Sequence, residues 1–184
     1  MLHFTLSAEC GSNCEAAETF ANHFRNVSWV FSNGADFSCR VGVVEALDWW
    51  CIVSPTGVSQ TGIHTPEDAY QMTEIGLLLY QKLRSAPPFR YALVGIEVDQ
   101  VRHYNELVTA CGKPDVPFHG FVIAEMVWRD IGCPVGFTSF APGYLWTPYQ
   151  GEVYSPLEVS PQLTKLFYEL LNLPPTNPTG EDRD

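Results

Sequence analysis

Three stretches of the chain repeat apolar residues at intervals of three and four, which is the pattern of one buried helix face. They span residues 13–25, 65–84 and 161–171. Asn13 stands before the first stretch as an N-cap, and Thr65 and Pro66 open the second with a capping hydroxyl and a proline at the first helical position. The sequence therefore predicts three helices with these bounds.

Runs rich in β-branched and aromatic residues predict strands, and they lie at residues 27–31, 40–46, 49–53, 91–98 and 121–123. Asn33-Gly34 favours a tight reversal after the first run. The run 91–98 is almost entirely apolar, which is typical of a strand buried on both faces. A helix from Asp99 to Val108 and a helical turn from Glu125 to Ile131 are expected to flank the run at 121–123.

This order of elements predicts an α+β fold: one domain over residues 1–172 with a largely antiparallel sheet and the helices 65–84 and 161–171 packed on one face. The alternative is a three-layer α/β fold with some parallel strand pairs, because helices separate several of the later strands. Residues 173–184 are rich in proline and then acidic, so we expect a disordered tail.

The 21 residues from 131 to 151 carry no charge and are rich in aromatic rings. They predict a hairpin of residues 137–140 and 144–149, joined by Pro142-Gly143 in a type II turn. Rings with polar groups are enriched at binding hot spots, so we assign a candidate binding surface to Phe137, Phe140, Tyr144, Trp146 and Tyr149, with Trp50. In the competing interpretation, Phe137 and Trp146 belong to the core and the tyrosines cover the sheet edge.

The net charge of −11 reflects a shortage of cations, because the chain has 21 acidic but only 10 basic residues. So few cations cannot neutralise many phosphates, and we expect no nucleic-acid partner. No apolar run is long enough to span a bilayer, and residues 1–9 do not resemble a secretory leader. We therefore expect no membrane partner and a cytoplasmic location, with the six cysteines reduced.

Two candidates for catalysis remain. Cys10 and Cys14 precede and begin the first helix, where the helix dipole would stabilise a thiolate, although their spacing is not that of common redox motifs. His119 and Glu125 bracket a strand and could act as a base with its orienting carboxylate. Metal-ligand and phosphate-binding motifs are absent, so we expect no metal and no cofactor.

These observations favour an acidic, non-catalytic protein-binding or adaptor domain that uses the aromatic hairpin against a protein partner or a second copy of itself. A small-molecule-binding domain with an aromatic-lined pocket is the second hypothesis, and a thiol- or His/Glu-dependent enzyme is the third. Under the first hypothesis, replacing Trp146 and Tyr144 together by alanine weakens the assembly and leaves the fold intact.

Overall fold

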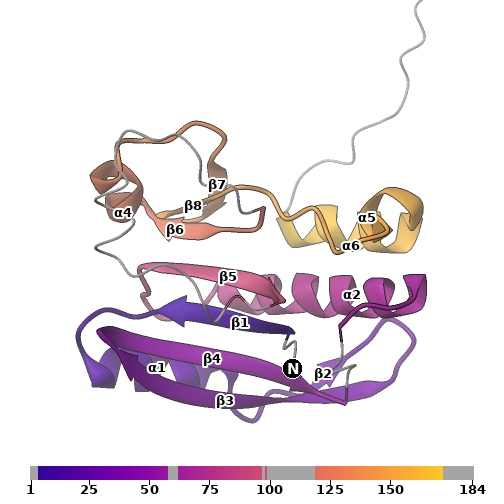
Figure 1. Ribbon diagram of the computed structural model, residues 1–184, viewed down its shortest axis with the longest axis horizontal. Coiled ribbons are helices and arrows are strands. Elements are labelled where there is room, and N and C mark those ends of the chain that lie inside the picture. The colour runs from indigo at the N-terminus through magenta and orange to yellow at the C-terminus, as the bar shows by residue number, and fades with distance from the viewer. Residues whose placement is uncertain (1–3, 58–61, 97, 99–118, 172–184) are drawn as a thin grey trace, which may run out of the picture.

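The computed structural model describes residues 4–57, 62–96, 98 and 119–171. In these residues one antiparallel sheet of eight strands is accompanied by five helices, which agrees with the expected α+β class (Figure 1). The strand order is β2-β3-β4-β1-β5-β6-β8-β7. The described strand pairs are all antiparallel, so the parallel pairs of the α/β alternative are not found among them.

The centre of the sheet is formed by β1 (Phe4–Glu9) and β5 (Tyr91–Ile96), which pair with each other. On one side β1 pairs with β4 (Asp48–Thr56), followed by β3 (Asp36–Ala46) and the short β2 (Trp29–Val30). On the other side β5 pairs with β6 (Val122–Ala124), followed by β8 (Tyr144–Trp146) and β7 (Thr138–Ala141). The sheet therefore ends at β2 and β3 on one side and at β7 on the other.

The predicted helices form with the predicted ends. In α1 (Cys14–Phe24) the Asn13 side chain accepts a hydrogen bond from the Glu15 amide at 2.8 Å. In α2 (Pro66–Leu83) Thr65 and Asp68 form a reciprocal capping box. The last long helix, α6 (Pro161–Leu171), follows the short α5 (Pro156–Val159). The predicted helix at 99–108 and the tail at 173–184 lie outside the described residues.

Two apolar clusters lie on the two faces of the sheet. The larger one joins Leu6, Val53 and Val94 of the sheet to side chains of α1, α2 and α6. The smaller one joins Trp50, Tyr91 and Leu93 to Val127 and Ile131, at α4 (Glu125–Asp130). Alternate residues of β4 and β5 thus enter different clusters, because successive side chains in a strand point to opposite faces.

Candidate functional site

The rings of the aromatic hairpin lie mostly inside the protein. Phe140, Trp146 and Tyr149 are 2%, 1% and 4% exposed, and all three rings pack around Tyr80 of α2, with ring centroids 5.2–6.3 Å from it. The Tyr80 hydroxyl donates a hydrogen bond to the Gly120 carbonyl at 2.8 Å, and burial raises the pKa of this phenol well above its usual value. This aromatic cluster packs the β7–β8 hairpin against α2.

Two glycines leave room for the cluster. A Cβ atom at Gly76 would lie 2.8 Å from the Tyr149 hydroxyl, and one at Gly120 would lie 2.2 Å from the Tyr80 hydroxyl. Gly120 also has a φ of +87°, which disfavours a side chain there on its own account. Glycine at these two positions therefore allows the tyrosine rings to approach the backbone closely.

The burial of these rings argues against their assignment to a binding surface. Trp50 is also buried, at 5% exposed, so four of the six candidate residues expose almost nothing. Tyr144 is half-buried, stacks on Phe89 with ring centroids 4.4 Å apart, and both donates to and accepts from the Phe89 backbone at 3.1 Å. Phe137 is half-buried against the smaller cluster. In this conformation the hairpin presents parts of two rings rather than a patch of five.

The clearest uncovered feature among the described residues is the outer edge of β3. This strand has 11 residues, none of them buried, and it pairs with β4 in unbroken register from Ser38 to Ala46. On its other side, β2 pairs only with Asp36 and Phe37. Nine residues of β3, a length of about 31 Å at about 3.4 Å per residue, therefore face outward without a described partner strand.

The sequence around Asn33 explains why β2 covers so little of β3. The Gly34 amide donates to the Phe31 carbonyl at 2.9 Å, and Gly34 has a φ of +83°, so the chain turns tightly as the Asn-Gly pair predicts. Before Trp29 the chain leaves the edge, and Asn26 adopts a φ of +57°. The pairing consequently stops after two residues.

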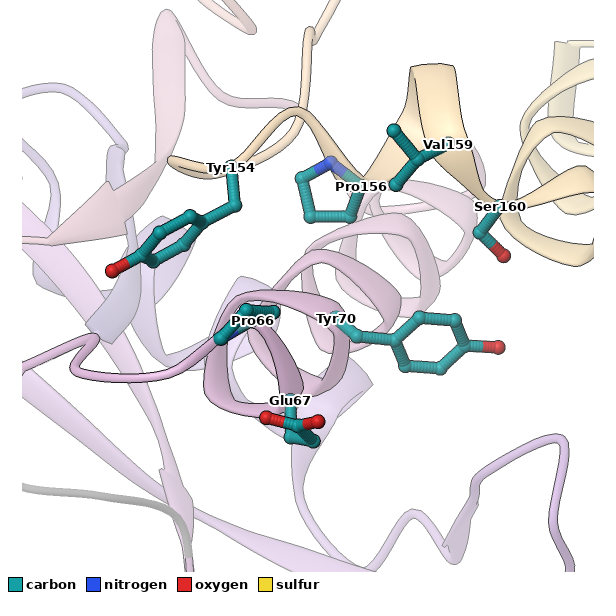
Figure 2. A pocket seen from close by; sticks show the side chains of 7 residues that line it. All are labelled: Pro66, Glu67, Tyr70, Tyr154, Pro156, Val159 and Ser160. Atoms are coloured by element: carbon teal, nitrogen blue, oxygen red, sulfur yellow. The ribbon is translucent and has the colours of Figure 1, made fainter.

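A shallow pocket of about 390 Å³ lies where the first turn of α2 meets α5 (Figure 2). Its wall contains two tyrosines and two prolines, and its one charged side chain is Glu67; the lining residues are Pro66, Glu67, Tyr70, Tyr154, Pro156, Val159 and Ser160. None of these residues belongs to the hairpin or to the tryptophans of β4. The predicted rings therefore do not line this pocket.

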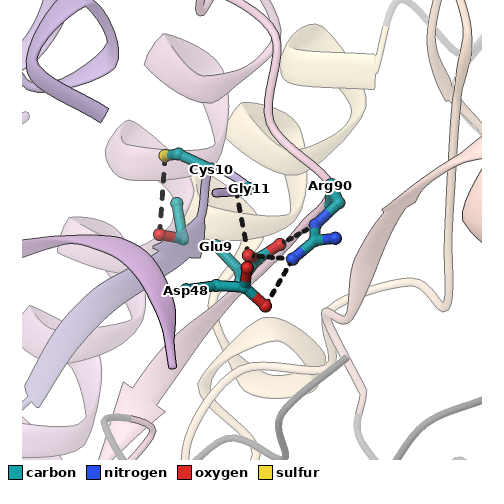
Figure 3. Close-up of polar contacts among 6 residues, drawn as sticks. Glu9, Cys10, Gly11, Asp48 and Arg90 are labelled. Carbon is teal, nitrogen blue, oxygen red and sulfur yellow. Dashed lines mark hydrogen bonds and ion pairs between the residues drawn. The ribbon is translucent and has the colours of Figure 1, made fainter. Parts of the chain in front are cut away.

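A charged cluster joins the ends of three strands (Figure 3). The Glu9 side chain is fully buried and accepts two hydrogen bonds from Arg90 at 2.5 Å and one from the Gly11 amide at 2.9 Å. Arg90 also pairs with Asp48 at 2.7 Å, and the hydrogen bond and charge of Glu9 raise the pKa of this guanidinium further. Sequence reasoning did not identify this cluster, because its members are far apart in the chain. It fastens the end of β1 to the β3–β4 turn and the start of β5.

Of the candidate thiol pair, Cys10 lies in surroundings that disfavour a reactive thiolate. Cys10 is buried at the end of β1, and burial raises the pKa of its thiol well above the usual value. The α1 dipole was expected to stabilise the Cys10 thiolate. Burial has the larger effect on this thiol, because its side chain lies among buried residues near Cys51. Cys14 is exposed, and the structure records both as free cysteines.

His119 is exposed and Glu125 is half-buried, and the hydrogen bonds of the described residues do not join them. The Glu125 carboxylate instead pairs with Arg129 one helical turn later. Within the described ranges, no group of three His, Cys, Asp or Glu side chains could hold a metal ion. The described helices also include none with the length and hydrophobicity needed to cross a bilayer.

Comparisons with family models, curated proteins and solved structures found no match for this chain.

Proposed function

We propose that this chain is a protein-binding domain that associates with a second copy of itself by pairing the edges of β3. The observation that carries the proposal is the nine-residue stretch of β3 without a described partner on its outer side. Alternate residues of such a strand direct their backbone N–H and C=O groups outward, which is a ready template for another strand.

The composition of β3 supports pairing because it lacks most of the features by which proteins protect an edge. Natural edge strands are blunted by lysine, proline, bulges or short length. The nine residues from Ser38 to Ala46 contain neither lysine nor proline, and their register with β4 has no shift. Arg40 and Glu45 are the two charged residues in this stretch.

Antiparallel pairing of two copies around Gly42 is compatible with these charges. A two-fold axis through Gly42 places Arg40 opposite Val44 and Glu45 opposite Cys39 of the second copy, so like charges do not face each other. The same register sets Val41 against Val43 on the helix-covered face, where both are half-buried in one chain. Pairing thereby adds apolar burial to the backbone hydrogen bonds.

Gly42 offers a sharp test, because a Cβ added there would meet no atom within 4 Å and its φ is ordinary. Lysine therefore fits the single chain, whereas two lysines would oppose each other across the paired edges. We expect light scattering to give the mass of two 20.6 kDa chains for the wild type and of one for Gly42→Lys. Gly42→Ala is the matched control and should remain paired.

Two results would count against the proposal. A wild-type protein that stays at the mass of one chain at every concentration removes the self-pairing. A Gly42→Lys variant that keeps the wild-type mass shows that the copies meet elsewhere. Far-UV circular dichroism of each variant establishes that the fold is retained.

The proposal also places the protein in the reducing environment of the cytosol. It is supported by the five described cysteines, which are free.

A further inference from the structure

We propose that the pocket between α2 and α5 binds a small organic cation with an alkylated ammonium group, which packs against tyrosine rings and is neutralised by Glu67. The proposal does not depend on the pairing of β3. It rests on the size and chemistry of the pocket wall, on the charge of the two segments that form this wall, and on the strained turn at Tyr154 and Ser155.

The pocket has the size and the surface of a site for a small ligand. Its volume of about 390 Å³ lies within the range of about 300–1,000 Å³ that is typical of small-molecule pockets. Tyr70 and Tyr154 contribute aromatic rings to the wall, on either side of Pro66 (Figure 2). Tyr154 is 55% exposed, so a ligand can reach its ring. The face of such a ring attracts cations as well as apolar groups, so the rings alone admit both kinds of ligand.

The charge of the wall favours the cation. Glu67 is the one charged residue that lines this pocket, and the ion pairs of the described residues do not include it. An apolar ligand would displace water from this carboxylate without replacing the lost interactions, whereas an ammonium group would form an ion pair with it. Glu67 therefore selects the cation among ligands of similar shape.

The surrounding charge acts in the same direction. Residues 62–81 and 151–164, which supply the wall, contain five acidic residues and neither lysine nor arginine. The next basic residues along the chain do not offset this charge, because Lys82 lies at the opposite end of α2 and Lys165 pairs with Glu169 at 3.6 Å. An excess of one sign of charge around a cleft raises the local concentration of ligands of the opposite sign.

The turn that carries Tyr154 has the strain that is common at binding sites. Tyr154 and Ser155 have φ values of +68° and +47°, which are unfavourable for residues with side chains. Such conformations persist only where the surrounding structure fixes them, and they cluster at ligand sites. Here the Glu152 amide donates to the Thr73 hydroxyl of α2 at 3.0 Å, and the Glu158 amide donates to the Ser155 carbonyl at 2.9 Å. The chain is thus fixed before and after Tyr154, so this part of the wall is formed without a ligand.

Titration of the full chain with choline chloride, followed by backbone amide signals in NMR spectra, tests the proposal. Choline carries a trimethylammonium group, and its matched control is neohexyl alcohol, the neutral analogue in which carbon replaces the nitrogen. We expect choline to cause saturable shifts at Glu67, Tyr70 and Tyr154, and the neutral analogue to bind about tenfold more weakly. Equal affinities for the two compounds overturn the proposal, and so does the absence of saturable shifts with choline.

Variants test whether the pocket residues bind the cation. Tyr154→Ala removes one ring and should weaken choline binding about fivefold, and Glu67→Gln should weaken it about threefold, because an exposed carboxylate contributes less. Tyr154→Phe keeps the ring and should bind as the wild type does. Val153→Ala is the control, because Val153 is equally exposed, at 59%, but does not line the pocket.

Two further results would overturn the proposal. One is an unchanged choline affinity in both Tyr154→Ala and Glu67→Gln, with far-UV circular dichroism establishing that both variants are folded. The other is the same set of shifts with sodium chloride at equal ionic strength, because it would assign the shifts to general screening of the acidic surface.

Discussion

Replacing Trp146 by alanine removes the largest side chain from the aromatic cluster that joins the β7–β8 hairpin to α2. Trp146 is 1% exposed, and its ring lies 5.4 Å from Tyr80, 5.0 Å from Phe140 and 6.3 Å from Phe167 by ring centroids. The change therefore leaves a cavity bounded by α2, α6 and the hairpin itself.

The expected cost follows from this burial. Truncating a buried tryptophan to alanine typically lowers the free energy of unfolding by about 3–5 kcal/mol. For a chain of this size each kcal/mol corresponds to about 2–4 °C, so the midpoint of thermal unfolding should fall by about 6–20 °C. Urea unfolding followed by circular dichroism measures the free energy directly, provided that the transition is two-state.

Val135→Ala is the control, because it also truncates an apolar side chain but at a site that is 86% exposed. Its free energy of unfolding should change by no more than about 0.5 kcal/mol. A loss of less than about 1 kcal/mol for Trp146→Ala, well below the range for buried tryptophan, would show that this ring contributes little to the stability of the fold. In particular, a stable Trp146→Ala variant that fails to associate would restore the hairpin as the binding surface.

Three further predictions concern charge and thiols. Arg90→Leu should lower the free energy of unfolding, measured in urea, by about 3–5 kcal/mol, because it leaves the fully buried Glu9 carboxylate without its cation. A loss below about 1 kcal/mol would mean that Glu9 finds another partner. Burial raises the pKa of Glu152, so the folded protein favours the protonated carboxyl group. The stability that this protonated group contributes is therefore fully present below the ordinary glutamate pKa, and it is lost as the pH rises through the raised pKa. Glu152→Gln should therefore raise the melting temperature at neutral pH with a smaller gain at acidic pH, and an equal gain at both would contradict this assignment. In a thiol-labelling time course on the native protein, Cys14 should react far ahead of Cys10, whose pKa is raised by burial; comparable rates would reopen the thiol hypothesis.

The elements that sequence reasoning placed well are those with local signals. The capping residues of α1 and α2 specify where these helices begin, and Gly143, at a φ of +78°, closes the β7–β8 hairpin as predicted. These signals act between residues a few positions apart, so they need no knowledge of the rest of the fold.

No local signal predicts β1, because its residues alternate in polarity without a turn or cap that marks its ends. Thr5, Ser7 and Glu9 are polar, yet all three are buried because β1 lies at the centre of the sheet between β4 and β5. Burial of a polar face is decided by long-range pairing and by partners such as Arg90, which a local pattern does not contain.

The candidate site could be predicted only in part for the same reason. The strand at 40–46 was expected, but its position near the edge follows from the order of eight strands and from the early end of β2. The aromatic hairpin formed as predicted, whereas the burial of its rings depends on Tyr80, Gly76 and Gly120, which lie elsewhere in the chain. Composition identified the rings, but it could not identify what they pack against.

Hydrogen exchange at the backbone amides from Ser38 to Ala46 tests the pairing of β3 most directly. In the wild type at high concentration, alternate amides on the outer side of this strand should exchange slowly, and dilution or Gly42→Lys should restore fast exchange. Fast exchange of these outward amides at every concentration would contradict the account, because an edge paired with a second copy has its amides hydrogen-bonded.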